Sequence, residues 1–244
     1  MKKLQWIFGV AASLAAVLIL LITSFQAAMY LDFDVYRKEY EKYEVLDDLE
    51  MEMDDVMYVT HEMMAYLKGD RPRLSVVTTV EGVEQDFFNE QDRFHMDEVQ
   101  GLFLGGLAIR RMAAVVLAVS LLILLAWKAD LKKILAGSYQ VTVGISGVLI
   151  LLLGIGISRN FNAVFTKFHE IFFDNDLWLF DPAEDYMIRM LPEGLFFDMV
   201  IRIGALFLGG LLILFICSIL AGKKRAGETD SFDPLTQRQG GELK

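Results

Sequence analysis

The sequence predicts an all-α membrane bundle of four transmembrane helices with a small mixed α/β extracellular cap. Three observations predict this fold class. The 244 residues are 55% hydrophobic and include 18 Phe and 12 Met, which is more apolar material than a soluble core of this size needs. Three long stretches carry no charge, and a fourth is apolar apart from two arginines. Basic and acidic residues also separate into different connecting segments, as they do in multi-pass membrane proteins.

The first predicted transmembrane helix covers residues 4–31, which contain no charged residue. A helical span needs roughly 20 apolar residues, so this stretch is long enough to cross a bilayer. A cleaved signal peptide is the alternative, because Lys2 and Lys3 provide a basic leader. The apolar part of a signal peptide has only about 7–15 residues, however. We therefore expect a retained anchor.

The first part of the cap is predicted over residues 32–100. Residues 34–67 contain neither Pro nor Gly and are rich in Tyr, Met, Glu and Leu, which predicts one or two helices. Residues 74–80 are rich in β-branched side chains, and residues 83–88 follow them after Glu81 and Gly82. This pattern predicts a strand and a return strand.

The remaining elements follow in order along the chain. Residues 101–127 and 134–158 are the second and third predicted spans, and residues 200–222 are the fourth. Between the last two, residues 159–199 form the second part of the cap, in which the turn sequence DPAED at 181–185 predicts a hairpin between 177–180 and 186–190. Residues 223–244 are a cytoplasmic tail that we expect to be disordered from residue 226 onward.

The distribution of charge predicts the orientation. The chain begins with Lys2 and Lys3, the 128–133 connection holds three Lys, and the tail opens with two Lys and one Arg. In contrast, residues 32–100 hold 20 acidic and 7 basic residues, and residues 159–199 hold 8 and 3. Because short cytoplasmic segments are enriched in Lys and Arg, both termini are predicted to be cytoplasmic, and the two long connections lie on the outer face of a bacterial plasma membrane.

Composition excludes several classes of function. The net charge of −10 argues against nucleic acid as a partner. One Cys and three His are too few for a cysteine-rich zinc module or a disulfide framework. His61 and His169 each begin a sequence like H-E-x-x-H, but Ala65 and Phe173 stand where the second histidine is needed. We expect no metal and no other cofactor, although His95 and His169 with nearby carboxylates around a metal remain an alternative.

The histidines are the best candidates for chemistry. All three lie in the predicted outer segments, and His95 and His169 fall near the ends of spans, at the depth of lipid headgroups. Nucleophiles are poor by comparison, because Ser75 lacks a G-x-S-x-G motif and Cys217 lies within the last span. This favours histidine acid and base catalysis on a substrate that carries its own nucleophile. Two surface histidines in interfacial helices are the simpler alternative.

Aromatic and polar residues surround the second histidine. Phe161, Phe165, Phe168 and Phe172 share one face of a helix, which fits either an interfacial aromatic belt or an acyl-binding wall that also includes Phe173. The polar residues Asp174, Asn175 and Asp176 follow them and form either a solvated turn or a group that orients His169. We expect Arg111 to snorkel to the surface. The candidates for supporting the histidines or positioning substrate are Asp97, Asn175, Asp176, Trp178, Arg110 and Arg202.

Three stretches resemble the integral-membrane family of lipoprotein intramolecular transacylases from Gram-positive bacteria. They are residues 89–99, the sequence FTKFHEIFFDNDLW at 165–178, and residues 181–198. The resemblance implies that the sn-2 acyl chain of a diacylglyceryl-modified lipoprotein moves to the α-amino group of its N-terminal cysteine, giving a lyso-form lipoprotein. It also implies that His95 and His169 are catalytic, that membrane lipid and lipoproteins are the partners, and that the active site lies at the outer leaflet.

This implied chemistry agrees with the residues available. Transfer from an ester to an amine needs one group that removes a proton from nitrogen and one that returns a proton to oxygen, and two imidazoles suit both tasks. Two other functions remain open at this point. One is a non-enzymatic membrane protein whose acidic cap binds a cell-envelope partner, and the other is a metal-dependent lipid hydrolase at the outer leaflet.

Overall fold

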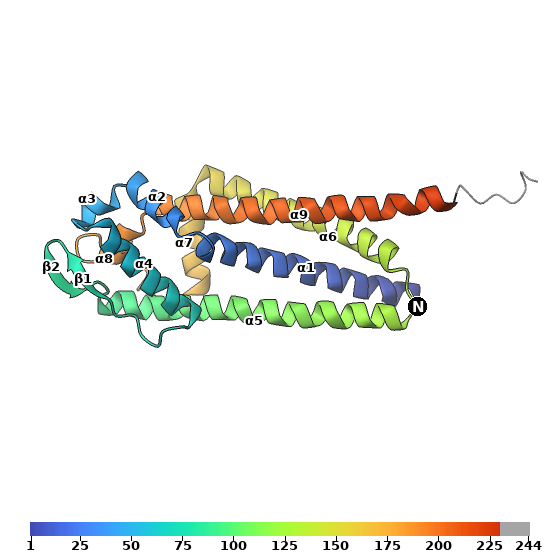
Figure 1. Ribbon diagram of the computed structural model, residues 1–244, viewed down its shortest axis with the longest axis horizontal. Coiled ribbons are helices and arrows are strands. Elements are labelled where there is room, and N and C mark those ends of the chain that lie inside the picture. Colours follow the sequence, from blue (N-terminus) through green and yellow to red (C-terminus); the bar gives the residue numbers. More distant parts are fainter. Residues whose placement is uncertain (230–244) are drawn as a thin grey trace, which may run out of the picture.

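The computed structural model describes residues 1–229, with only the backbone described for residues 221–229. Four long helices dominate it (Figure 1), and each is long and apolar enough to cross a membrane, as the sequence predicts. Their bounds are α1 Lys2–Tyr30, α5 Glu90–Ala126, α6 Leu131–Arg159 and α9 Glu193–Thr229.

Helix α1 is the centre of the bundle, because it packs against α5, α6 and α9. Small side chains allow these close approaches. A Cβ atom added to Gly210 of α9 would stand 2.7 Å from Leu20 of α1. Ser13 and Ser138 share a hydrogen bond of 2.9 Å between α1 and α6. Small residues and interhelical hydrogen bonds are the usual means by which helices associate in membranes.

Apart from α7, which is described with the site, the other elements gather at one end of the bundle (Figure 1) and form a unit that we call the end domain. The opposite end holds the N-terminus, the α5–α6 connection and the last turns of α9. The two termini of the described chain thus share one end, as four spans require. The end domain consists of α2 Asp34–Lys42, α3 Val45–Leu49, α4 Met53–Lys68, β1 Val77–Val80, β2 Val83–Asp86 and α8 Tyr186–Met190.

The first half of the end domain has the predicted types of secondary structure. The two strands are antiparallel and pair from Val77 with Asp86 to Val80 with Val83, which confirms the predicted strand and return strand. The predicted helical region contains three helices rather than one or two. Its breaks fall at Glu44 and Glu50, which have positive φ angles of 56° and 49°. Nothing in the residue types marks these breaks, since non-glycine residues seldom adopt positive φ.

The predicted hairpin in the second half is wrong. Residues 186–190 form the short helix α8, and residues 177–180 form no strand. The turn itself is present, because the Asp185 carboxylate accepts a hydrogen bond of 2.7 Å from the Asp181 amide. Met187 and Met190, three residues apart, are both buried in the end-domain core. Two buried residues at helical spacing favour a helix over the predicted strand in this segment.

Two of the long helices begin well before the predicted spans. Helix α5 begins at Glu90 rather than at residue 101, and α9 begins at Glu193 rather than at residue 200. Helix α9 also continues to Thr229, so residues 226–229 are helical where the sequence predicts a disordered tail; the rest of that tail lies outside the described residues. Apolar stretches locate the membrane crossing, but caps determine where a helix starts.

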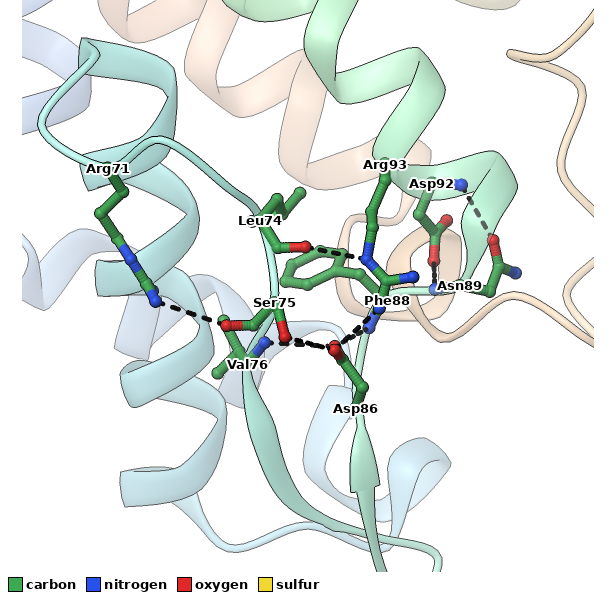
Figure 2. A network of polar contacts seen from close by, with 9 residues as sticks. All are labelled: Arg71, Leu74, Ser75, Val76, Asp86, Phe88, Asn89, Asp92 and Arg93. Carbon is green, nitrogen blue, oxygen red and sulfur yellow. Dashed lines mark hydrogen bonds and ion pairs between the residues drawn. The ribbon is translucent and has the colours of Figure 1, made fainter.

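A polar network joins the strands to the start of α5 (Figure 2). The carboxylate of Asp86 accepts hydrogen bonds from Ser75 Oγ and from the amides of Val76 and Phe88, at 2.6, 3.1 and 3.2 Å. Arg93 forms an ion pair of 2.8 Å with Asp86 and donates through Nε to the Leu74 carbonyl. Since Arg93 lies in the first turn of α5, the network holds the strand pair against that turn.

Candidate active site

Helix α5 begins with a capping box that determines the position of His95. The Asn89 side chain accepts from the Asp92 amide, and the Asp92 carboxylate accepts from the Asn89 amide, both at 2.9 Å (Figure 2). Asn89 Nδ2 also donates to Asp185, which ties the 181–185 turn to the same helix end. His95 follows in the second turn of α5, and its side chain is buried, with 5% exposure.

His169 lies on the short helix α7, Phe161–Phe172, which crosses the direction of the long helices (Figure 1). Asn160 caps this helix by accepting a hydrogen bond of 3.0 Å from the Ala163 amide. The exposed face of α7 carries an ion pair between Lys167 and Glu170. His169 faces inward and is 7% exposed.

The two histidines meet at the junction of α5 and α7. Their ring centroids are 5.9 Å apart, and the ring planes differ by 26°. Aromatic side chains enclose the pair. His95 contacts the rings of Phe173 and Phe180, with centroids 4.8 and 5.4 Å away. His169 contacts four rings, those of Phe165, Phe168, Phe173 and Trp178.

Hydrogen bonding determines which ring nitrogen of His169 can accept a proton. Its Nδ1 lies 2.8 Å from the carbonyl oxygen of Phe165. A carbonyl only accepts, so Nδ1 carries the hydrogen and the neutral ring has its lone pair on Nε2. Burial lowers the pKa of His169, although the bond to Phe165 opposes this effect. At neutral pH the ring is therefore neutral and able to take a proton at Nε2.

We expect an NMR titration of ¹³C-labelled histidine rings to show this directly. The chain has only three histidines, so three ring signals appear, and substitution of each histidine by alanine assigns them. The midpoint of His169 lies below the ordinary histidine pKa of about 6.5, because burial disfavours the charged ring. A midpoint above 6.5 would contradict a neutral His169.

Several residues predicted for the site do surround the histidine pair. Phe165, Phe168, Phe173 and Trp178 are in direct ring contact with His169. Asn175 follows α7, and its Nδ2 donates to Glu98 Oε1, one helical turn after His95, at 2.8 Å. Phe172 is 52% exposed and contacts the ring of Phe168 instead.

Four other residues predicted for the site, all in the described part of the chain, form no hydrogen bond, ion pair or ring contact with either histidine. Asp97 is exposed and accepts a hydrogen bond of 3.3 Å from the Tyr66 hydroxyl, on another face of α5 from His95. Residues two apart on a helix point about 200° from each other, which explains this separation. Asp176 is exposed. Arg110 bonds to Gln26 of α1, and Arg202 pairs with Asp32 at 3.6 Å.

Two residues of the site were missing from the sequence interpretation. Phe180 contacts His95, and Glu98 lies on the same face of α5 as His95. The spacing of three residues between His95 and Glu98 was a usable signal, because such pairs are neighbours on a helix surface. Phe180 had no comparable signal, since the chain around it forms no regular element.

The described residues contain no group of three or more histidine, cysteine or carboxylate side chains placed to hold a metal ion. Of the carboxylates that the sequence places near the two histidines, Asp97 accepts a hydrogen bond from Tyr66 and Asp176 is exposed.

The fold is shared with a membrane protein of known structure. Among curated protein sequences, none matches the chain. The solved structure of the membrane-integral lipoprotein intramolecular transacylase Lit from Bacillus cereus has the same fold, with a TM-score of 0.74 at 19% identity, over 93% of this chain and 99% of that one. Structures of two variants of that protein, with one histidine replaced by alanine or by arginine, match with TM-scores of 0.69 at 19% identity, over 92% and 93% of this chain and 96% of theirs.

A family model also matches most of this chain. The model described as "Lipoprotein intramolecular transacylase Lit" matches residues 10–197, which is well over half of the chain and includes both His95 and His169. The chain therefore belongs to the Lit family of lipoprotein intramolecular transacylases, and it is an acyltransferase.

Proposed function

We propose that the protein transfers the sn-2 acyl chain of a diacylglyceryl-modified lipoprotein to the α-amino group of its N-terminal cysteine, leaving a lyso-form lipoprotein. The observation that carries this proposal is the buried pair of histidine rings, 5.9 Å apart, at the junction of α5 and α7. Family membership supplies the reaction class. The histidine pair supplies groups that suit its proton transfers.

The reaction breaks one bond and forms another. The amine nitrogen attacks the sn-2 carbonyl carbon, a C–N bond forms, and the C–O bond to glycerol breaks. Nitrogen loses a proton and the departing oxygen gains one, so the overall change is balanced. Burial lowers the pKa of His95 to about 4 and also lowers the pKa of His169, so both rings start neutral. A neutral imidazole can remove a proton from nitrogen, and a ring that has taken up a proton can then pass one to the departing oxygen.

The protein needs no nucleophile of its own, because the amine and the ester belong to one substrate. Its main task is to hold that substrate folded back on itself. Favourable positioning of this kind offsets on the order of 7–11 kcal/mol of a reaction barrier. The rings of Phe165, Phe173, Phe180 and Trp178 around the histidines support such a confined site. A confined site of this kind limits hydrolysis of the ester by water.

We place the site at the outer leaflet of a bacterial plasma membrane, with both termini in the cytoplasm. The support is the excess of basic residues at the chain start and in the 128–133 connection, together with the acidic end domain. Ester bonds of membrane-anchored lipids lie at headgroup depth, where α7 presents exposed apolar side chains such as Phe168, Ile171 and Phe172. These side chains suit contact with lipid.

Mass spectrometry of a synthetic diacylated lipopeptide tests this function. After incubation with the purified protein in detergent, the lipopeptide keeps its mass, but its N-terminus becomes resistant to amine reagents and to Edman degradation. Release of fatty acid would instead indicate a hydrolase, and sensitivity to chelators would favour the metal-dependent version. A lipopeptide that binds and stays unchanged would indicate the non-enzymatic alternative, and any of these outcomes would overturn the proposal.

A further inference from the structure

Glu98 is a carboxylate within the site that the proton transfers described above do not use. It lies one helical turn after His95 on α5. Its Oε1 accepts the hydrogen bond from Asn175 Nδ2 at 2.8 Å, which holds the side chain in place. Its Oε2 is buried and has no hydrogen-bond partner among the described residues. No cation of the described chain pairs with this carboxylate.

His95 also has a buried polar atom without a hydrogen-bond partner in the described chain. Its Nδ1 is buried and also lacks a hydrogen-bond partner among the side chains that the structure describes, and the whole residue is only 5% exposed. Residues three apart on a helix lie about 5–6 Å from each other between their Cβ atoms, so Glu98 and His95 are neighbours on the same face of α5. Buried polar atoms are nearly always paired in folded proteins, and leaving one unpaired is unfavourable.

With Nδ1 of His95 as the acceptor of a neutral ring, a ligand that satisfies both atoms must donate at least two hydrogen bonds, and the carboxylate of Glu98 favours a ligand with a positive charge. The substrate class of the proposed function contains one such group, the α-ammonium of the N-terminal cysteine. An ammonium has three N–H donors, and an α-amino group with a pKa of about 7.7–8.0 is largely protonated at neutral pH. The diacylglyceryl part of the substrate carries no comparable donor.

We propose that Glu98 binds the α-ammonium of the lipoprotein substrate through Oε2 and presents it to His95 Nδ1. This inference rests on the proposed function. His95 takes one proton from the ammonium, and the neutral amine then attacks the sn-2 carbonyl carbon. As the C–N bond forms and the C–O bond breaks, the second proton passes from nitrogen through His169 Nε2 to the glycerol oxygen. The proton on His95 returns to water, so protons and charge balance.

Recognition of the ammonium also accounts for selection between substrate and product. The product carries an amide in place of the ammonium, so it has no positive charge for Glu98 to bind. A carboxylate that loses its cationic partner in a buried site disfavours the bound state. The product therefore leaves more readily than the substrate, and an already N-acylated lipoprotein is a poor ligand.

The test uses two unreactive, fluorescently labelled lipopeptides whose sn-2 chain is attached by an ether bond. One has a free α-amine and the other is N-acetylated. Their dissociation constants are measured for the wild type, for Glu98→Gln, and for Glu90→Gln as a control. Glutamine keeps an oxygen for Asn175 but removes the charge. Glu90 is an exposed residue of the same helix outside the site.

We expect the wild type and Glu90→Gln to bind the free amine about ten- to a hundredfold more tightly than the acetylated lipopeptide, as a charge-assisted hydrogen bond implies. In Glu98→Gln this preference disappears, because only the free amine binds less tightly. Glu98→Asp, which keeps the charge, retains a preference and provides the second variant if Glu98→Gln folds poorly.

Two results would overturn the inference. An undiminished preference of Glu98→Gln for the free amine would show that Glu98 does not bind the ammonium. An equal loss of affinity for both lipopeptides would show a purely structural role. The proposed function fails in a different way, namely if the wild type leaves the sn-2 ester lipopeptide unconverted. Because the ether analogues measure binding alone, the two failures are distinguished.

Discussion

Replacing either His95 or His169 by alanine lowers the rate of acyl transfer by about 10²- to 10⁴-fold, which is the contribution expected of a positioned acid or base. The double variant is no slower than the slower single variant, because residues that act as one unit lose their effect together. The measurement is the initial rate of conversion of a diacylated lipopeptide to its N-acylated isomer. Both rings are buried within one aromatic enclosure, so each substitution removes a group for which no neighbour substitutes.

His61→Ala is the matched control. His61 is exposed and stacks on Phe33 with centroids 4.1 Å apart, away from the histidine pair. Its substitution leaves the rate within about twofold of the wild type, as expected of a residue outside the reacting groups. Full activity in either His95→Ala or His169→Ala would refute the assignment of the pair.

Phe173→Ala is expected to have the second-largest effect. Phe173 is 5% exposed and contacts both His95 and His169, with centroids 4.8 and 5.4 Å away. Removing a buried phenylalanine costs about 3–5 kcal/mol of stability. The cavity also lets both rings shift, and a displacement of about 1 Å in a positioned site lowers a rate by on the order of 10²-fold. We therefore expect a lower midpoint of thermal unfolding together with a lower rate.

The neighbouring residue provides the control for this substitution. Phe172 is 52% exposed and contacts Phe168 rather than either histidine. Phe172→Ala removes the same side chain from the same helix end, yet we expect little change in stability in detergent and a rate close to that of the wild type. Equal effects of the two substitutions would contradict the view that Phe173 holds the histidine pair in place.

The sequence alone predicted the elements of the fold that follow from long patterns of hydrophobicity and residue type. Stretches without charge located four membrane-spanning helices, since a charge in the bilayer is costly wherever it occurs. The β-branched run before Glu81 and Gly82 located the strand pair. The segment at 186–190 was misassigned because five residues carry too little periodicity, and the burial of Met187 and Met190 decided its structure.

The candidate site was predictable only in its main residues. His95 and His169 stood out as the histidines nearest to the spans, and the family resemblance paired them. Their supports depend on directions that a linear sequence does not show. Asp97 is two residues from His95 but points to Tyr66, whereas Glu98 is three residues away and contacts Asn175. Arg110 and Arg202 are similarly drawn to Gln26 and Asp32 by the packing of the long helices.

Acyl transfer within one substrate molecule, without an acyl-enzyme, is the central claim, and an isotope crossover experiment tests it most directly. The purified protein is incubated with two lipopeptides at once, one with a deuterated sn-2 chain and a light peptide, the other with an unlabelled chain and a ¹³C-labelled peptide. We expect N-acylated products in which each peptide keeps its own acyl chain. Mixed products, with deuterated chains on ¹³C-labelled peptides, would contradict the claim, because they require transfer between molecules or through the protein.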